Sequence, residues 1–269
     1  MDFTSLLQNL TQFLPSENSS PKSPYAKTLF IISAHPDDEC IQGGIALRLM
    51  QENNFHVVNI AVTLGSDVKR QKARQKELEK ATDFLGFENI VLSEDWKLKE
   101  KELASLISKY QPSVILCHHE EDHHPTHIKC AKLLHKVCSK NEFSEPFMIL
   151  WNEFWGQLKA PQVLIEIPVD LLEKQMSALE LHVGEVKRNP YHLRLPAWMM
   201  DNVRRGAEVI AGKGSKAPAF AFGVLVMIAF YHKKKIIKKK TNIPSVIKAK
   251  DDLYRILSAA SLSKTRRKS

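Results

Sequence analysis

Ionisable side chains are concentrated in one six-residue string, Ala34-His35-Pro36-Asp37-Asp38-Glu39. The string follows an apolar run, and burying so many ionisable groups beside a core is costly unless a cation or hydrogen bonds compensate them. His35 and Asp38 are three residues apart, so a turn that opens a helix can direct both the same way. Imidazole nitrogen and carboxylate oxygen suit a borderline ion such as Zn²⁺. The string therefore predicts a metal site, with an acidic helix N-terminus as the structural alternative.

A second string carries five of the chain's 11 histidines within ten residues, His118-His119-Glu120-Glu121-Asp122-His123-His124-Pro125-Thr126-His127. It follows a short apolar run and precedes a predicted helix. A solvated polar loop is the alternative, but it gives no reason to concentrate histidines at the end of one strand. This string therefore supports the metal hypothesis.

The two strings together offer His35, Asp38 and one further histidine as ligands. Three protein ligands and a water molecule are typical of a catalytic zinc site. Zinc lowers the pKa of bound water from about 15.7 towards 7 and polarises a carbonyl group. Asp37 is not needed as a ligand and can serve as general base, while a second histidine can stabilise an oxyanion and protonate a leaving amine. This set of groups suits amide hydrolysis.

Strands and helices alternate along the chain, which predicts an α/β fold with a Rossmann-like, doubly wound, mostly parallel sheet flanked by helices. In such sheets ligands bind at the carboxyl ends of the strands, where both strings lie. Beyond the helix that leads to His182, we expect Pro190, Pro196 and Pro218 to interrupt regular structure. The predicted strands are 28–34, 56–63, 89–92, 113–117, 147–153, 163–167 and one ending near 231, and the predicted helices are 41–52, 68–85, 98–110, 125–140 and 170–182.

These motifs resemble the PIG-L/LmbE-like family of zinc-dependent N-acetylglucosaminyl deacetylases. The hallmarks of that family are an AHPDDE string after the first strand and an HPDH-type string after a later one. The resemblance covers about residues 28–230 and implies an LmbE-like fold. It also implies that His35, Asp38 and His127 bind zinc, that Asp37 is the base and that His124 is the oxyanion and acid group.

Other landmarks of the family look present in Thr63-Leu64-Gly65, in Arg74-Gln75-Lys76-Glu77 and in Leu85-Gly86. The arginine of the family's R-x-x-E string approaches the substrate, which implies a substrate-binding role for Arg74. The alternative is a surface residue on a charged helix.

One departure concerns Thr126, which stands where the family has an acid that orients the first histidine of HPDH. Glu121 or Asp122 could supply the missing carboxylate, and His119 and His123 are the alternatives to His124.

Three further features carry alternatives of their own. His182 is predicted to be a hydrogen-bonded core histidine rather than a ligand. The strings 188–192 and 201–206 either form a specificity rim or cap helices.

Three regions are predicted: an N-terminal helix and linker over 1–27, a PIG-L/LmbE-like deacetylase domain over 28–231, and a basic C-terminal tail over 232–269. The net charge is +9, with lysines clustered at 233–235 and 238–240. We expect a solvated tail, with weak contact to an acidic membrane surface as the alternative. Nucleic-acid binding is not expected, because no aromatic interleaving or nucleic-acid motif accompanies the charge. The apolar run 217–231 is shorter than the roughly 18 residues of a membrane span and predicts a buried strand.

The four cysteines show no C-x-x-C spacing and lie in apolar surroundings, as reduced thiols of a cytoplasmic protein do. The first residues lack the basic start and apolar stretch of a secretory signal. We therefore expect a cytoplasmic enzyme.

The sequence thus predicts a zinc-dependent hydrolase that removes an N-acetyl group from a small amino sugar or a GlcNAc-type conjugate. One alternative is a zinc amidase that acts on a non-sugar or thiol-conjugate amide. Another is a non-catalytic protein that docks through its basic tail. The oligomeric state is left open.

Overall fold

A mixed sheet forms the centre of the computed structural model, which describes residues 3–11, 27–238 and 242–260. Within these residues the strand order is β3-β2-β1-β4-β5-β7-β6-β9, and β8 pairs with β7. Strands β1 to β5 are all parallel to one another. The strands are β1 (Lys27–Ser33), β2 (Phe55–Ala61), β3 (Glu88–Val91), β4 (Val114–His118), β5 (Phe147–Asn152), β6 (Val163–Glu166), β7 (Gly223–His232), β8 (Lys235–Lys238) and β9 (Val246–Ile247).

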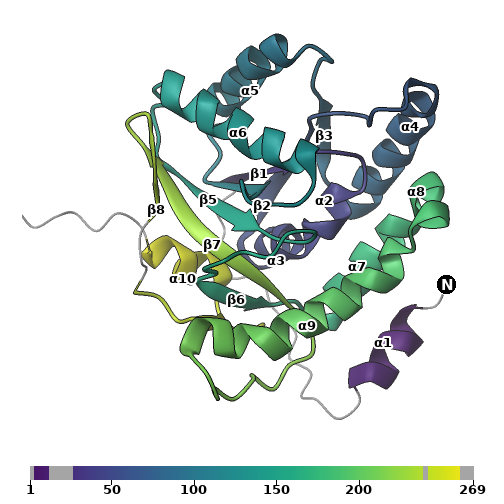
Figure 1. Ribbon diagram of the computed structural model, residues 1–269, viewed down its shortest axis with the longest axis vertical. Coiled ribbons are helices and arrows are strands. Elements are labelled where there is room, and N and C mark those ends of the chain that lie inside the picture. The colour runs from purple at the N-terminus through teal and green to yellow at the C-terminus, as the bar shows by residue number, and fades with distance from the viewer. Residues whose placement is uncertain (1–2, 12–26, 239–241, 261–269) are drawn as a thin grey trace, which may run out of the picture.

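Helices cover both faces of the sheet (Figure 1). Helices α5 and α6 lie on one face, and α3 and α7 lie on the other. The predicted α/β, Rossmann-like fold is confirmed. The helices are α1 (Phe3–Thr11), α2 (Asp38–Ile41), α3 (Gly43–Asn53), α4 (Val68–Leu85), α5 (Trp96–Tyr110), α6 (Pro125–Lys140), α7 (Val169–Glu180), α8 (Val183–Arg188), α9 (Tyr191–Ala211) and α10 (Leu253–Ala259).

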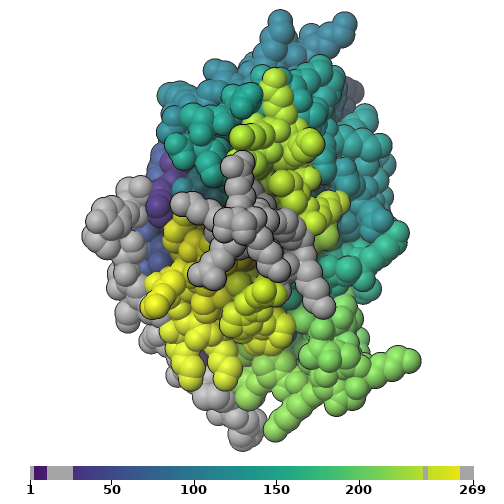
Figure 2. All heavy atoms as spheres, turned by 90° about the vertical axis from the view of Figure 1, so that its left-hand side faces the viewer, coloured from purple at the N-terminus to yellow at the C-terminus, as the bar shows by residue number. Residues whose placement is uncertain are grey.

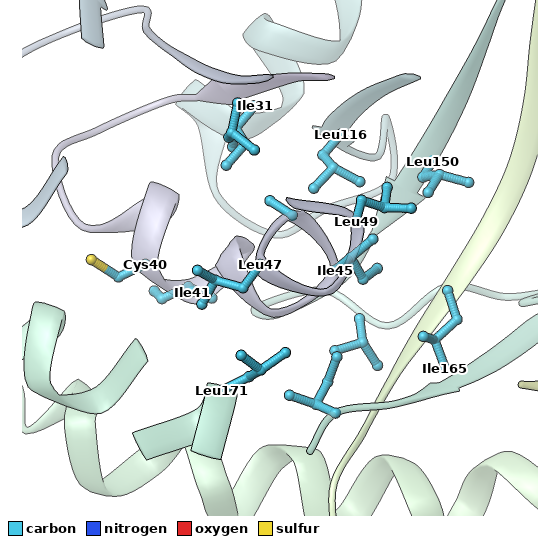
Figure 3. Packing of buried hydrophobic residues seen from close by; sticks show 14 of the residues in the cluster. Ile31, Cys40, Ile41, Ile45, Leu47, Leu49, Leu116, Leu150, Ile165 and Leu171 are labelled. Atoms are coloured by element: carbon cyan, nitrogen blue, oxygen red, sulfur yellow. The ribbon is translucent and has the colours of Figure 1, made fainter. Parts of the chain in front are cut away.

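Strand β1 is the central strand that delivers the first motif. Its residues from Leu29 onward are buried, because β2 and β4 flank it and helices cover both its faces. Alternate side chains therefore enter two cores: Ile31 faces the cluster under α3, and Ile32 faces the cluster under α5 and α6. In Figure 3, Ile31 of β1 and Leu116 of β4 lie on the same side of the sheet as helix α3.

Strand β7 is the main departure from a parallel sheet. It runs antiparallel to both β5 and β6, between which it lies. The strand predicted to end near residue 231 is confirmed as β7, whose residues are almost all buried. Among the described residues, no helix has the length and apolarity that crossing a membrane requires.

The segment after residue 231 differs from the predicted basic tail. Strand β8 completes a hairpin with β7, β9 pairs with β6, and α10 buries Leu253 and Leu257 in the core under α3. Figure 2 shows this yellow C-terminal part gathered on one face beside the yellow-green hairpin. The tail prediction missed these elements because lysines dominate the composition while a few apolar residues make the contacts.

Two other predictions concern the ends of the domain. Helix α1 is present as predicted, and it buries Phe3 and Leu7 against the core that α7 also joins. The predicted linker lies outside the described residues. The expected interruption at Pro196 is wrong, because this residue lies inside α9, near its start.

A buried arginine fixes the C-terminal segment to α3. Arg48 is fully buried, and its Nε lies 2.5 Å from Oε1 of Glu52. Its guanidinium also donates to the carbonyl oxygens of Glu166 (2.9 Å), Lys248 (3.1 Å) and Asp251 (3.2 Å). One cation therefore satisfies a buried carboxylate and joins three distant parts of the chain.

We predict that Arg48→Met lowers the free energy of unfolding by about 3 to 5 kcal/mol, because it leaves Glu52 buried without its cation. Urea denaturation measures the loss. Arg204→Met, at an exposed arginine of α9, is the matched control and should change stability by less than about 0.5 kcal/mol. An unchanged midpoint for Arg48→Met would contradict the role given to this residue.

Candidate active site

The turn after β1 holds Asp37 in a strained conformation. Its φ is 114° and its ψ is −27°, a region that non-glycine residues rarely adopt and that costs about 1 to 3 kcal/mol. The Asp37 backbone N–H donates to Oε2 of Glu39 (2.9 Å), and its carbonyl accepts from Cys40 (3.0 Å) and Ile41 (3.1 Å). These bonds hold the strained residue, so its side chain is presented from a fixed backbone.

Glu39 is fully buried and anchors this turn. Its Oε1 lies 2.6 Å from Nε2 of His182, a residue of the α7–α8 connection. Glu39, Cys40 and His182 form one buried donor cluster. The prediction of a hydrogen-bonded core histidine at 182 agrees with this position.

Potential metal ligands meet where β1 and β4 end side by side. Nδ1 of His35 lies 3.7 Å from Oδ2 of Asp38, and Nε2 of His127 lies 3.6 Å from Oδ1 of Asp38. Two overlapping donor clusters share His127: one adds His35 and His124, and the other adds Asp38 and His118. Two ligands of one tetrahedral zinc ion, each about 2.0 to 2.2 Å from it, lie about 3.3 to 3.6 Å apart. His35 and His127 therefore each lie at a distance from Asp38 that a shared ion could span, but they approach different oxygens of Asp38, and neither donor cluster contains all three residues.

His118 is a site residue that the sequence argument did not single out. This last residue of β4 is fully buried, and its ring stacks on His127 with centroids 3.7 Å apart. Its Nε2 lies 3.4 Å from Oδ2 of Asp38 and 3.0 Å from Nε2 of Gln42. The signal that could have found it is its position as the final strand residue beside the first motif.

Asp122 orients a histidine of the second motif. It is one of the two carboxylates, with Glu121, that we expected could take this role. However, its Oδ1 lies 3.3 Å from Nδ1 of His127, so it supports this histidine rather than His124. The same oxygen accepts from the backbone N–H of His124 (2.7 Å). Glu121 is instead exposed and paired with Lys159.

His124 caps helix α6. Its Nδ1 accepts from the backbone N–H of Thr126 (3.3 Å), so the neutral ring carries its proton on Nε2. The two alternatives lie elsewhere: His119 is buried and contacts the carbonyl oxygen of Gly156 (2.8 Å), and His123 is exposed. Among the three, only His124 lies in a donor cluster with His35 and His127.

Burial and neighbouring charge shift the carboxyl groups in opposite directions. Burial, reinforced by the Asp38 carboxylate, raises the pKa of Asp37 well above its usual value. Burial also acts to raise the pKa of Asp38, but the adjacent His118 and His127 outweigh it and hold that pKa well below the usual value. Within the described residues the Asp37 carboxylate has no recorded hydrogen-bond or ion-pair partner, and it lines the cavity.

Arg74 braces the turn from helix α4. It is 8% exposed, which differs from the surface alternative, and its Nη2 donates to the carbonyl oxygen of Pro36 (2.8 Å). Its Nε lies 3.6 Å from Oε1 of Glu185, a buried carboxylate that also pairs with Arg70 and Arg188. Although burial acts to raise the pKa of Glu185, these arginines lower it. Arg74 therefore reaches both the first motif and the cavity wall.

A cavity of about 410 Å³ opens above these groups. Two tryptophans line it, Trp96 at the start of α5 and Trp155 after β5, and they are 37% and 39% exposed. Arg188 and Tyr191 of the string 188–192 also line it, and burial raises the pKa of Tyr191 to about 12. The string 201–206 lies inside α9 and contributes no residue to the lining.

Comparison with protein families gives one match. The family model described as PIG-L, GlcNAc-PI de-N-acetylase, matches residues 30–138, which include both motifs and amount to less than half of the chain. The resemblance to the PIG-L family is confirmed over this segment. A comparison with curated protein sequences found no match.

Solved structures share the fold at low sequence identity. The N,N'-diacetylchitobiose deacetylase of Pyrococcus horikoshii is 19% identical, with a TM-score of 0.56 over 84% of this chain and 91% of that chain. A zinc-inhibited form of teicoplanin deacetylase is 13% identical, with a TM-score of 0.58 over 79% and 99%. The 4-carboxy-2-hydroxymuconate hydratase of Pseudomonas putida is 16% identical, with a TM-score of 0.56 over 75% and 95%. The fold is therefore shared by more than one kind of enzyme.

Gly65 leaves room for the Arg74 guanidinium. Its φ is 93°, and a methyl group built on its α-carbon would collide with Nη1 of Arg74. Gly86 has a similar φ of 80°, but there the nearest side-chain atom, Cε of Met50, is 4.0 Å away. Both glycines thus adopt a positive φ, and they differ in how closely other side chains approach them.

We predict that Gly86→Ala lowers the free energy of unfolding by about 1 kcal/mol, the usual cost of this conformation for alanine. Gly65→Ala should lower it by about 2 to 3 kcal/mol, because the collision adds to that cost. Urea denaturation of the two variants measures the difference. Equal losses would show that Arg74 moves freely and does not brace the turn.

Proposed function

We propose, from the PIG-L resemblance of residues 30–138 and the geometry of the site, that this protein is a zinc-dependent N-deacetylase. The observation that carries the proposal is the approach of His35 and His127 to Asp38, beside an Asp37 carboxylate that has no hydrogen-bond or ion-pair partner among the described residues and lines the same cavity. The substrate we propose is an N-acetylated amino sugar or its conjugate.

The donor set fits a divalent cation. Two imidazoles and one carboxylate are ligands that zinc accepts, and the recorded separations of 3.6 and 3.7 Å from Asp38 suit a shared ion. Asp122 lies behind His127, as the carboxylate behind a ligating histidine does in many zinc sites. When bound there, zinc supplies Lewis acidity that polarises the acetamide carbonyl and acidifies water.

The residues around the cavity then take different roles in hydrolysis. Asp37 accepts a proton from a water molecule, while the oxygen of that water molecule forms a bond to the carbonyl carbon. His124 donates from Nε2 to the developing oxyanion, since its Nδ1 is engaged by the N–H of Thr126. The C–N bond then breaks, and the amine leaves with the proton that Asp37 returns. His124, proposed above as both oxyanion and acid group, is better suited to the first role because protonating Nδ1 would lose the bond from Thr126.

The cavity walls support a sugar-like substrate. The exposed parts of Trp96 and Trp155 offer surfaces on which a sugar ring can stack, and polar and charged residues line the same cavity. Two structural neighbours are deacetylases named for diacetylchitobiose and teicoplanin. The hydratase neighbour matches the fold as well as the first of these, so fold alone does not select the reaction. The family match around both motifs favours deacetylation.

The test is acetate release from a panel of N-acetylated compounds, with metal analysis of the purified protein. We expect about one zinc per chain, turnover of N-acetylglucosamine conjugates, loss of turnover with a chelator and recovery with zinc. N-acetylated thiol conjugates and N-acetyl amino acids in the panel address the non-sugar alternatives. Absence of both zinc and acetate release would favour a non-catalytic docking protein.

We predict that Asp37→Asn retains zinc but releases acetate at least about a thousandfold more slowly, because the amide cannot accept the proton from water. Metal analysis and an acetate assay measure the two effects separately. Asp83→Asn, at an exposed carboxylate of α4, should leave both unchanged. Near-normal turnover by Asp37→Asn would remove this residue from the base role.

We predict that Asp122→Asn weakens zinc binding by about 10- to 100-fold, because His127 loses the carboxylate that orients its ring. Competition with a chromophoric chelator measures the affinity. Glu121→Gln is a matched control at the adjacent carboxylate, which is exposed and faces Lys159. The same affinity in both variants would show that Asp122 does not support a ligand.

A further inference from the structure

The loop after β5, residues 153–158, connects two parts of the site that are distant in sequence. Its Trp155 lines the catalytic cavity, and its Gly156 packs against the second motif. A Cβ atom built on Gly156 would lie 2.7 Å from Cα of Asp122 and 2.9 Å from the backbone nitrogen of His123. Both distances are shorter than Cβ atoms make in proteins, so this contact between two backbones requires glycine. We call residues 153–158 the Trp155 loop.

A histidine of the second motif strengthens this contact. Nε2 of His119 lies 2.8 Å from the carbonyl oxygen of Gly156, and because a carbonyl oxygen can only accept, this nitrogen carries a proton. Nearby, Oδ1 of Asp122 lies 3.3 Å from Nδ1 of His127 and accepts from the backbone N–H of His124 (2.7 Å). A shift of the Trp155 loop would therefore reach the Asp122 carboxylate and the two histidines that it contacts.

A buried ion pair anchors the base of the loop. Glu153 is 1% exposed, and its Oε2 accepts from the backbone N–H of Leu158 (2.6 Å), which closes the loop. Its Oε1 pairs with Nη2 of Arg205, a residue of α9 that also donates to Oδ1 of Asn202 (3.1 Å). The string 201–206 lines no part of the cavity, but its arginine thus holds the loop that does.

Aromatic contacts hold the exposed ring of the loop. The ring of Trp155 lies edge-on to Tyr191, with centroids 5.8 Å apart. Phe154 lies edge-on to Trp155 (5.1 Å) and to Trp198 of α9 (5.2 Å). Aromatic pairs favour this edge-to-face arrangement. The position of the tryptophan on the cavity wall therefore depends on the same loop and the same helix as the contact of Gly156.

We infer that the Trp155 loop is a positioning element that sets the metal site and the cavity wall together. Gly156 is its contact with the second motif, and the pair of Glu153 and Arg205 is its anchor. The inference rests on the proposed function, which places zinc beside His127. Gly156 and Arg205 act on this histidine only through Asp122, so they are positioning residues rather than catalytic ones.

The direct test is Gly156→Ala, because the added methyl group has no room unless the loop or Asp122 moves. We expect zinc affinity, measured by competition with a chromophoric chelator, to fall about tenfold, as when a carboxylate behind a ligating histidine is disturbed. In the metal-free protein, the NMR signal of the His124 amide proton should shift, because its bond to Asp122 changes. Gly43→Ala is the matched control, since a Cβ atom there would have no neighbour closer than 3.8 Å, and it should change neither quantity.

Arg205→Met tests the anchor, with Arg48→Met as its control, because each leaves a buried glutamate without its cation and only the first lies behind the loop. At saturating zinc, we expect Arg205→Met to raise KM about threefold to tenfold and to change kcat less than about twofold, because the Trp155 wall moves while the proposed base does not. Arg48→Met should leave both constants unchanged. Adding Glu153→Gln to Arg205→Met should restore KM, since the amide oxygen can still accept from Leu158 and carries no charge.

Wild-type zinc affinity and an unshifted His124 signal in Gly156→Ala would overturn the inference, as would equal KM values in Arg205→Met and Arg48→Met. If Arg205→Met does not fold, the comparison of Gly156→Ala with Gly43→Ala decides. A wild-type protein that neither binds zinc nor releases acetate would count against the proposed function. The NMR signal of the metal-free protein would still show in that case whether the loop positions Asp122.

Discussion

Three carboxylates in one buried turn are the constraint that the rest of this structure meets. Asp37, Asp38 and Glu39 follow β1 directly and are at most 7% exposed. The cost of burying each carboxylate is offset by different neighbouring groups. Glu39 contacts His182 and the backbone, and Asp38 lies among histidines, where an ion could also bind. Asp37 has only the more distant charge of Arg74, which acts to lower its pKa without overcoming burial. The carboxylate with the least compensation thus lines the cavity, next to Asp38.

The sheet topology brings the compensating groups to this turn. Strands β1 and β4 are parallel neighbours, so the residues after them meet although more than 80 positions separate them in sequence. Helix α4 supplies Arg74, and the α7–α8 connection supplies His182. Few of these contacts are local. The motif therefore keeps its geometry only inside the complete fold, which explains why a strained φ at Asp37 is tolerated there.

The sequence was sufficient for the α/β class, for most elements through α7 and for the approach of His35 and His127 to Asp38, because these follow from periodicity and from motifs at strand ends. The sequence was insufficient for residues whose contact partners lie far away along the chain. His118 looked like one more histidine in a polar string, and only the pairing of β4 with β1 places it against Asp38. Arg74 lies on a charged helix whose composition hides its burial. In the C-terminal segment, lysines dominate the composition and favoured the prediction of a solvated tail. Two buried leucines of α10 nevertheless pack this segment against the core.

The bonds of Arg48 also bear on the order in which the chain can fold. Its partners at Lys248 and Asp251 lie about 200 residues further along the chain. Until that late segment arrives, the cation and Glu52 have to remain hydrated or be buried with unmet hydrogen bonds, and the core under α3 stays incomplete. The strands of the parallel half of the sheet all precede these partners in the chain, so the bonds of Arg48 to Lys248 and Asp251 can form only after that late segment has been synthesised. The domain thus acquires its last buried charge network only after nearly all the residues around the active site have emerged.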